Sequence, residues 1–329
     1  MSDSEKELSS LSPAQRELHR KALLKLLRGL RPAPDEVASR VAQALDPEYW
    51  RALAPELSIG NDTGALPAKS IGSRRCNELC AKLSREGYVH LDSVIARPAL
   101  PAMLSLLTTL RDYKWPLAMA FVYDQFWYAW RVPALVRMAS AFLGPGYRIV
   151  PQRVWVFHVQ PVRGAAGFPL HSDAPGVTDR LNVWIPLTEV TLDNSCIYVI
   201  PKDLGTARVR KFFSSPTPVS EIAEAMQMAR PLPARAGSIL CWDSEVYHWG
   251  AICHAPGLER ISIGVELIGE RATPMDDEDD LIDHRLMPSF EQRLRAIGRS
   301  ITWYIRRDLT MLRHQDLARA LRHPIIPPG

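Results

Sequence analysis

The chain has 329 residues, of which 47% are hydrophobic and 23% charged, and its formal net charge is +4 at pH 7. This composition is typical of a globular protein, and no apolar run approaches the roughly 18 residues that a membrane-spanning helix needs. The first ten residues are polar and partly acidic, unlike a secretion signal, and the five cysteines include no C-x-x-C pair. We therefore expect a cytoplasmic protein without a disulfide framework or a structural zinc site.

Helical patterns fill the N-terminal region of the chain. Ser12, Pro13 and Gln15 are placed as in a capping box that begins a helix, and apolar residues follow at helical spacing. We predict a helix over residues 13–28, whose basic outer face leaves two interpretations open, a membrane surface or, favoured here, packing against the body of the protein. Further helices are predicted around residues 35–54, 72–86, 98–112 and 131–143, before a Gly-Pro-Gly break at 144–146.

The pattern changes after this break. Short segments rich in Val, Ile, Trp and Tyr, bounded by Gly, Pro, Asn or Asp, follow one another without helical patterns between them. They favour an antiparallel β core over a parallel α/β sheet, and a double-sheet, cupin-like jelly roll (double-stranded β-helix) is the simplest closed form. The segments are RVWVFHVQPV, RLNVWIPLTEV, SCIYVIP, GSILCW and RISIGVELI.

Helical periodicity returns from residue 286. The predicted fold is therefore mainly β in its core with flanking α-helices at both ends, an α+β arrangement in one domain over residues 1–329. It is divided into a helical N-terminal region over residues 1–146, a β core over residues 147–270 and a helical C-terminal region over residues 286–323.

Charge is distributed unevenly over the last sixty residues. Residues 276–280 read DDEDD, whereas residues 290–323 carry eight arginines against three acidic residues. Such a surplus can face nucleic acid, anionic lipid or an acidic substrate, although a solvated basic helix face is the more common cause. No nucleic-acid-binding motif accompanies it, so no nucleic-acid partner is predicted.

The stretch FPLHSDAPG, residues 168–176, places His171 and Asp173 one residue apart. On a β-strand these side chains would point the same way and could bind a metal, but the same letters also suit a polar loop. A third ligand could come from one of three histidines. His158 has the pattern of a core or surface histidine and His254 lies in a predicted loop, whereas His248 follows the strand-like AGSILCWDSEVY and is the best placed. Two histidines and one carboxylate are the ligands of non-haem Fe(II) oxygenases.

An arginine and a serine follow this trio. Arg260 begins the predicted strand RISIGVELI 12 residues after His248, and Ser262 falls on the same face of that strand. The planar guanidinium can bind a carboxylate through two hydrogen bonds. It would suit the distal carboxylate of 2-oxoglutarate, the usual electron source of such oxygenases.

Four segments together resemble the phytanoyl-CoA dioxygenase family of Fe(II)- and 2-oxoglutarate-dependent oxygenases, over roughly residues 150–268. They are LHSD, LNVWIPLTEVTLDNSCIYVIP, AGSILCWDSEVYHWG and RISIGVE. The resemblance implies a double-stranded β-helix core, His171, Asp173 and His248 as iron ligands, and Arg260 with Ser262 at the distal carboxylate. It also implies that Trp184 borders the 2-oxoglutarate pocket. Asn182 shares the face of Trp184 and either touches the co-substrate or makes a polar core contact.

The same resemblance implies a single catalytic domain that uses Fe(II), 2-oxoglutarate and O2. Asp173 stands where the family's halogenases have a small residue, so hydroxylation, desaturation or a related oxidation of an unactivated C–H is expected, with release of succinate and CO2. No catalytic residue is expected beyond the iron ligands. The N-terminal helices and a loop around 202–235 should define the substrate, for which a small organic molecule is our first choice, but no feature there identifies it.

Three alternatives stay open at this stage. The first is a non-catalytic jelly-roll binding protein, although no ligand is missing. The second is zinc-dependent hydrolysis at the same three residues, which would leave Arg260 and Ser262 without a purpose. The third is a hydroxylase at a membrane surface acting on a lipid-linked anionic substrate, which the basic segments at both ends would favour. The oligomeric state is not predicted.

Overall fold

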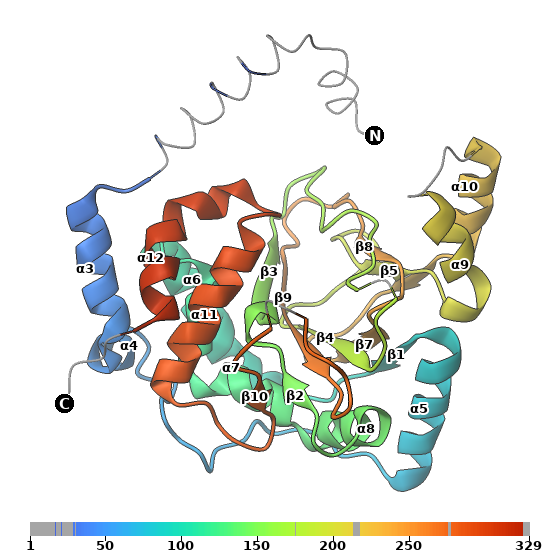
Figure 1. Cartoon of the computed structure of the whole chain (residues 1–329), viewed down its shortest axis with the longest axis horizontal. Helices are drawn as coiled ribbons and strands as arrows, with labels where there is room; N and C mark the ends of the chain where they lie inside the picture. The colour runs from blue at the N-terminus through green and yellow to red at the C-terminus, as the bar shows by residue number, and fades with distance from the viewer. Residues whose placement is uncertain are drawn as a thin grey trace.

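The computed structural model describes Glu17, Lys21, Gly29 and the ranges 31–174, 176–212, 218–275 and 278–324. A β core lies between two groups of helices (Figure 1). The helix predicted over residues 13–28 falls outside the described residues, apart from Glu17 and Lys21, which are helical. Within the described ranges, no helix combines the length and the apolar content needed to cross a membrane.

Most N-terminal helices lie where their patterns predict them. The predicted helix over 35–54 is divided at Asp46, whose carboxylate accepts a hydrogen bond from the Glu48 N–H and begins a new helix with Pro47 at its first position. The helices are α3 (Pro34–Leu45), α4 (Pro47–Leu53), α5 (Ser73–Glu86), α6 (Leu100–Asp112), α7 (Asp124–Tyr128) and α8 (Pro133–Leu143). Three short 3-10 helices join them, η1 (Arg97–Ala99), η2 (Leu117–Val122) and η3 (Ala129–Arg131).

The described strands form two sheets in which every pairing is antiparallel, which confirms the predicted β core. The larger sheet has the order β1-β7-β4-β9-β2-β10, with β3 also paired to β9, and the smaller has the order β6-β5-β8. The 3-10 turn η4 (Pro151–Arg153) separates β2 from β3 along the same edge of β9. The strands are β1 (Tyr88–Leu91), β2 (Arg148–Ile149), β3 (Trp155–Val159), β4 (Arg180–Pro186), β5 (Ile197–Val199), β6 (Arg230–Leu232), β7 (Ile239–Asp243), β8 (His248–Gly250), β9 (Arg260–Ile268) and β10 (Ile282–Asp283).

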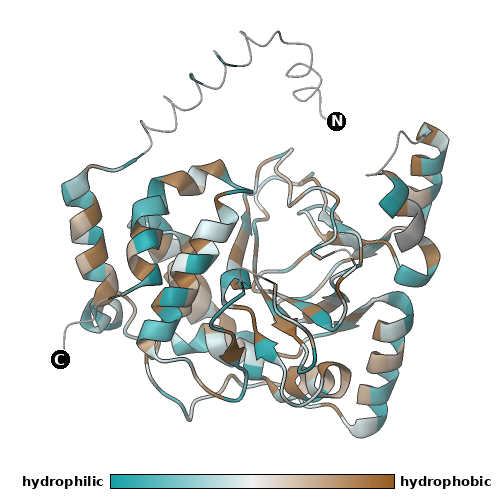
Figure 2. Cartoon of the chain, in the orientation of Figure 1, coloured by the Kyte–Doolittle hydropathy of each residue, from teal (hydrophilic) through white to brown (hydrophobic). Residues whose placement is uncertain are grey.

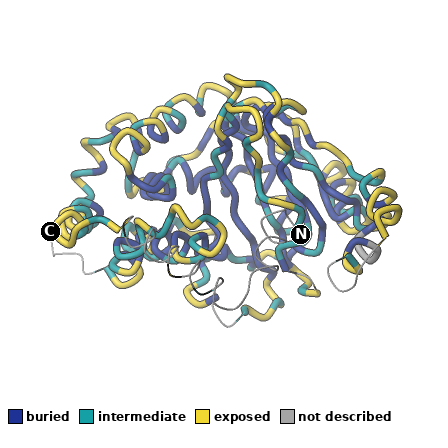
Figure 3. The backbone as a smooth tube through the Cα atoms, turned by 90° about the horizontal axis from the view of Figure 1, so that it is seen from above, coloured by how far each residue is buried: buried dark blue, intermediate teal, exposed yellow. Residues whose placement is uncertain are grey.

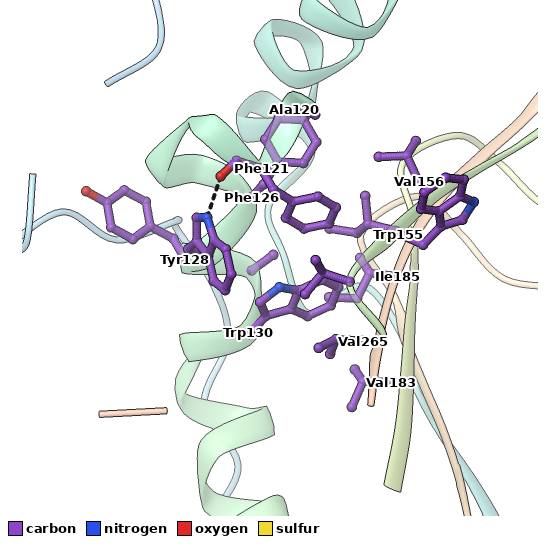
Figure 4. Close-up of a cluster of buried hydrophobic side chains, with 14 of the residues drawn as sticks. Ala120, Phe121, Phe126, Tyr128, Trp130, Trp155, Val156, Val183, Ile185 and Val265 are labelled. Atoms are coloured by element: carbon purple, nitrogen blue, oxygen red, sulfur yellow. Dashed lines mark hydrogen bonds between the residues drawn. The ribbon is translucent and has the colours of Figure 1, made fainter. Parts of the chain in front are cut away.

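The central strands are buried on both faces, and the two faces differ in chemistry. Every residue of β9 is buried, and the central strands are largely hydrophobic, whereas hydropathy alternates along the surface helices (Figures 2 and 3). Val183, Ile185 and Val265 point outward toward Trp130 and the other aromatic side chains of the helical layer (Figure 4). The even-numbered residues of β4 and β9 face the smaller sheet, because side chains alternate along a strand. The inner face is therefore free to carry polar groups.

Three details of the predicted boundaries are wrong. The region expected to be helical up to residue 146 contains β1, which pairs with the edge of β7, and β10 lies beyond the expected end of the core at 270. Strands this short are specified mainly by the sheet edge that they meet, not by their own pattern. The region 202–235, expected as a loop, holds α9 (Lys202–Phe212), α10 (Val219–Gln227) and β6.

The C-terminal region is helical, as predicted. It consists of α11 (Phe290–Tyr304), the 3-10 turn η5 (Leu309–His314) and α12 (Gln315–Arg322). A capping box begins α11, in which the Ser289 hydroxyl accepts from the Gln292 N–H and the Gln292 side chain accepts from the Ser289 N–H. Ile297 and Ile301 are fully buried on the inner face of this helix, so α11 belongs to the core and is not an appendage.

Candidate metal centre

His171, Asp173 and His248 meet at one point between the two sheets. One ligand atom from each lies within 4.8 Å of the other two. Nε2 of His171 is 3.6 Å from Oδ1 of Asp173, and Nε2 of His248 is 3.6 Å from Oδ2 of the same carboxylate. Among the described residues, this is the one group of three or more His, Cys, Asp or Glu side chains with such a spacing.

The convergence has a different local cause from the one predicted. His171 and Asp173 are not neighbours on one strand. Instead, His171 forms an isolated bridge with His248 through backbone hydrogen bonds of 3.0 and 2.9 Å. The chain then bends, and the N–H groups of Asp173 and Ala174 both donate to the carbonyl of Ser244 at 3.1 Å. The smaller sheet and this bend thus bring the ligands together.

Each imidazole is held by its own backbone. Nδ1 of His171 lies 2.7 Å from the carbonyl oxygen of Pro169, and Nδ1 of His248 lies 3.0 Å from that of Val246, in each case two residues earlier. A carbonyl can only accept, so Nδ1 carries the proton and the lone pair of Nε2 faces Asp173. Burial lowers the pKa of His248 to about 4, which keeps this ring neutral at pH 7. Neutral imidazoles with a free Nε2 are suited to bind a metal ion.

The carboxylate of Asp173 is held in its charged form. Burial alone would raise its pKa, but His248, His171 and the indole N–H of Trp242 outweigh burial and hold the pKa well below its usual range. Nε1 of Trp242 donates to Oδ2 at 3.2 Å. Two imidazole nitrogens and one carboxylate oxygen that converge on one point are the donor set of a 2-His-1-carboxylate Fe(II) site, so the residues present fit this metal.

The other two candidate histidines lie elsewhere. His158 is on β3, and its Nε2 is 2.9 Å from Oε2 of Glu259. His254 is exposed in a loop, where its backbone N–H donates to the carbonyl of Asp193. Both therefore have the structural or surface roles predicted for them, and neither joins the metal centre.

Arg260 is a buried cation without a carboxylate partner among the described residues. Its residue is 3% exposed, Nη1 donates to the carbonyl of Ser195 at 2.5 Å, and Nε has no hydrogen-bond partner. The hydroxyl of Ser262, two residues along β9, is fully buried and also lacks a partner. Burial lowers the pKa of Arg260 to about 10, so the guanidinium stays charged at pH 7. Unpaired buried polar groups of this kind indicate a ligand site.

Two glycines leave room beside this guanidinium. A Cβ atom on Gly167 would lie 3.1 Å from Nη2 of Arg260 and 2.8 Å from the Cα of Gly250, and one on Gly250 would lie 3.3 Å from Nη1. Any side chain at either position would push the two chain segments apart or displace the guanidinium. The close approach of these segments therefore depends on glycine.

Trp184 and Asn182 line the same cavity as the three candidate ligands and Arg260. The Trp184 ring is 5.7 Å from the guanidinium carbon of Arg260 and is almost fully buried. The Asn182 amide donates to the hydroxyl of Ser244 at 3.4 Å. Of the two roles left open for Asn182, the polar contact within the protein is therefore present in this structure.

The cavity has a wall that sequence patterns did not predict. Phe157 and Phe168 lie on one side, and α11 with the turn after it supplies Trp303, Tyr304 and Arg307. Alternation along β3 could have placed Phe157 on the inner face, but its direction was open until β3 was paired with β9. The contribution of α11 has no local signal, since it depends on how a helix more than a hundred residues after His171 packs on the sheet.

Comparison with protein families agrees with this geometry. Residues 122–251 match the family model described as phytanoyl-CoA dioxygenase, which includes all three candidate ligands. Residues 122–251 of the chain are thus similar to a phytanoyl-CoA dioxygenase domain, a domain of non-haem Fe(II)- and 2-oxoglutarate-dependent oxygenases. The resemblance noted in the four sequence segments is confirmed. No curated protein matches the chain in sequence.

Solved structures share the fold at low sequence identity. The non-heme monooxygenase ThoJ in its apo form is 15% identical, with 73% of this chain and 99% of that chain covered and a TM-score of 0.51. The α-ketoglutarate-dependent epimerase SnoN from nogalamycin biosynthesis is 17% identical, with 64% and 88% covered and a TM-score of 0.48. The carbocyclase SnoK from the same biosynthesis is 16% identical, with 64% and 88% covered and a TM-score of 0.48. The likeness to ThoJ supports the jelly-roll fold.

Proposed function

We propose that this protein is a dioxygenase that uses Fe(II), 2-oxoglutarate and O2 to hydroxylate or otherwise oxidise an unactivated C–H of a small organic substrate. The observation that carries the proposal is Arg260, a buried guanidinium with no carboxylate partner among the described residues, in the cavity that also holds the His171, Asp173 and His248 cluster. A buried charge is stable only when it is paired, so this arginine calls for an anionic ligand. 2-Oxoglutarate would supply that anion.

Each residue has a defined role in this proposal. His171, Asp173 and His248 would hold the iron through two Nε2 atoms and one carboxylate oxygen. Arg260 and the Ser262 hydroxyl would bind the distal carboxylate of 2-oxoglutarate, and Trp184 would form the wall beside it. The bound iron, with 2-oxoglutarate and O2, supplies the oxidising power for C–H cleavage and releases succinate and CO2. Phe157, Phe168 and Tyr304 exclude water and hold the substrate carbon in place.

The proposal also covers the cellular location of the enzyme and its binding partners. We place the enzyme in the cytoplasm as a single catalytic domain acting on a small molecule, without a nucleic-acid partner. Membrane association is not favoured, because four of the eight arginines in residues 290–323 are engaged in ion pairs, namely Arg293, Arg295, Arg299 and Arg319. A zinc hydrolase would leave Arg260 and Ser262 unexplained, and a non-catalytic binding protein would not need a complete ligand set.

The test is the formation of succinate by the purified full-length chain with Fe(II), ascorbate and 2-oxoglutarate. We expect slow succinate release even without substrate, and its loss in Asp173→Ala, because a neutral, short side chain removes one metal ligand. Asp193→Ala, in an exposed loop, is the matched control and should leave the rate unchanged. Succinate formation by Asp173→Ala at the wild-type rate would contradict the assigned iron site.

A further inference from the structure

A second cavity lies beside the metal centre. It is bounded by β3, the end of α6, the loop before the HSD segment, and the turn η5. Five side chains line both cavities, namely Phe157, Phe168, Arg260, Tyr304 and Arg307. We call the second cavity the outer cleft. Because the two share these walls, a molecule that enters the metal pocket past Phe157 and Tyr304 would extend into the outer cleft.

The outer cleft is positively charged. Besides Arg260 it is lined by Arg111, Lys114, Arg307 and Arg313, and Asp308 is the acidic side chain among its lining residues. One oxygen of the Asp308 carboxylate, Oδ1, accepts hydrogen bonds from the N–H of Thr310 at 2.9 Å and from its hydroxyl at 2.6 Å. Arg111 is neutralised by Glu259 at 3.1 Å. The remaining cations, Lys114, Arg307 and Arg313, line the same cleft and form no ion pair with Asp308.

Three of these cations have no ion pair with a carboxylate in the described ranges of the chain. They are Lys114, Arg307 and Arg313. Two other arginines of the C-terminal segment are paired, Arg299 with Asp279 and Asp280, and Arg319 with Asp316 at 3.1 Å. Arg306 and Arg322 also have no ion pair in the described ranges, but they line a different depression, whereas Arg307 and Arg313 line the cleft.

Local structure constrains the Arg307 side chain and the Lys114 backbone. The Arg307 guanidinium lies 4.6 Å from the centre of the Trp303 ring, which holds it at the boundary between the two cavities. Lys114 has a φ of 58°, a left-handed conformation that few non-glycine residues adopt, at the end of α6. His314 adds no charge at pH 7, because burial lowers its pKa to about 4.

We propose that the outer cleft binds an anionic group of the substrate, a phosphate ester or a carboxylate, while an apolar portion of the same molecule occupies the aromatic pocket at the metal centre. This inference rests on the proposed function, since it names the substrate class of that site. Arg307 and Arg313 can each donate paired hydrogen bonds to such a group, and Lys114 adds a third positive charge. The substrate class is then an amphipathic acid.

The experiment compares three probes of one chain length, namely octyl phosphate, octanoate and octanol. Each is titrated against the full-length protein loaded anaerobically with Fe(II) and 2-oxoglutarate, and binding is followed by quenching of tryptophan fluorescence, because Trp115 and Trp155 line the cleft. We expect both anions to bind at least about ten-fold more tightly than octanol, since charge-assisted hydrogen bonds are added. The tighter of the two anions identifies the natural headgroup as phosphate or carboxylate.

Two variants and a control locate the binding. Arg307→Gln and Arg313→Gln should each weaken the anions by about ten-fold and leave octanol unaffected. Arg306→Gln is the matched control, because Arg306 is the next residue along the chain and lines a different surface depression with Arg322. It should leave all three probes unchanged. Equal binding of octanol and the anions, or equal weakening by Arg306→Gln and Arg307→Gln, would overturn the proposal.

Succinate formation by the wild type, measured in parallel, distinguishes a failure of the proposed oxygenase activity from a failure of the proposed anion site. If the anions bind as expected while the wild type forms no succinate, the oxygenase proposal fails and the anion site stands. If succinate forms and the probes do not discriminate by charge, the anion site fails and the oxygenase proposal stands.

Discussion

The chemistry proposed for this cavity depends on one buried guanidinium, that of Arg260. Removing an ion from water costs several kcal/mol even after the protein relaxes, and a nearby carboxylate usually offsets that cost. Arg260 has one hydrogen bond to a backbone carbonyl and no such carboxylate among the described residues. The guanidinium is therefore available to an anionic ligand, as the proposed function requires.

Substitution of this arginine should separate co-substrate binding from metal binding. Arg260→Ala removes charge-assisted hydrogen bonds of roughly 1.5–3 kcal/mol each, so the affinity for 2-oxoglutarate should fall by a factor of roughly ten to a few hundred. Iron content should hardly change. Arg260→Lys keeps the charge without the two-pronged geometry and should restore the affinity only partially. The visible band expected when 2-oxoglutarate binds the Fe(II) protein anaerobically gives the titration, and a wild-type curve for the alanine variant would contradict the assignment.

Trp242 acts on the metal centre through Asp173. Its N–H donates to Oδ2 of Asp173, and this hydrogen bond orients the carboxylate at the site. Trp242→Phe keeps an aromatic ring but removes this donor, and the loss of a partner that orients a metal ligand typically lowers metal affinity by about 10–100-fold. Trp249→Phe is the control, because Trp249 is close to His248 in sequence but stacks on Tyr198. Competition with a chromogenic chelator measures both, and equal affinities for the two variants would show that the indole N–H does not matter.

Residue patterns predicted which three side chains converge at the candidate metal centre, because the signal for them is local. His171 and Asp173 are two residues apart, and His248 and Arg260 each stand at the start of a strand with a clear pattern. Trp303, Tyr304 and Arg307 were not predicted as cavity residues, because their place depends on the packing of α11 against the β core. Candidate ligands that are close in sequence, or that follow a strand pattern, can be deduced from the sequence. Cavity residues supplied by a distant helix cannot, because they depend on tertiary packing.

At the level of elements, a buried chain of ion pairs joins the acidic segment to the β core. Arg180 on β4 contacts Oε1 of Glu266 at 2.7 Å and Oε1 of Glu278 at 2.8 Å, and Nε of Arg153 lies 3.1 Å from Oε2 of Glu266. All four residues are at most 8% exposed. The Arg153 guanidinium also lies 3.7 Å from the Trp303 ring of α11. The DDEDD run therefore contributes to the core through Glu278, which its composition alone did not reveal.

Breaking this chain should cost more than breaking an exposed pair nearby. Glu278→Gln leaves Arg180 buried with one carboxylate fewer, and we expect it to lower the free energy of unfolding by about 3 kcal/mol. Asp280→Asn removes an ion pair with Arg299 in which the Asp280 side chain is 55% exposed, and it should cost less than about 1 kcal/mol. Urea unfolding of the two variants at pH 7 makes the comparison. Equal losses would mean that the buried pair contributes no more than a surface one.

The effect of Glu278 should also depend on pH in a defined direction. Although burial opposes it, the hydrogen bond from Arg180 lowers the pKa of Glu278 in the folded protein. Its contribution is therefore complete above the unfolded value of about 4.3 and is lost as the pH falls through the folded value. The stability difference between wild type and Glu278→Gln should shrink in that acidic range.

Helices and strands with a clear hydrophobic periodicity were predicted correctly. Short strands that form only because they pair with the edge of a sheet were not predicted. Helices α5, α6, α8 and strand β9 lie within two residues of their predicted bounds. By contrast, β1 and β10 exist because a sheet edge is available to them. The helices of the 202–235 region were missed because their apolar residues are few and partly exposed, as Leu204 and Val219 show.

At the scale of the whole molecule, the flanking helices and the β core form one packed body. Arg293 of α11 and Asp124 of α7 make a fully buried ion pair of 2.6 Å, and the same carboxylate accepts from the N–H groups of Gly60 and Asn61. Gly298 lets α12 approach α11 closely, since a Cβ there would lie 2.7 Å from the carbonyl of Ala318. Segments far apart in the described part of the chain thus share one core.

This packing predicts a single cooperative unfolding transition for the full-length chain, in which the C-terminal helices melt together with the β core. Since Fe(II) and 2-oxoglutarate bind only the folded site, they should stabilise the whole molecule, by about 2.7 kcal/mol when the free ligand is at 100 times its Kd. Anaerobic calorimetry, followed in parallel by circular dichroism and tryptophan fluorescence, should give one coincident transition that shifts as a unit when the ligands are added. Two separated transitions, of which the ligands move only one, would instead divide the chain into a catalytic core and an independent helical unit.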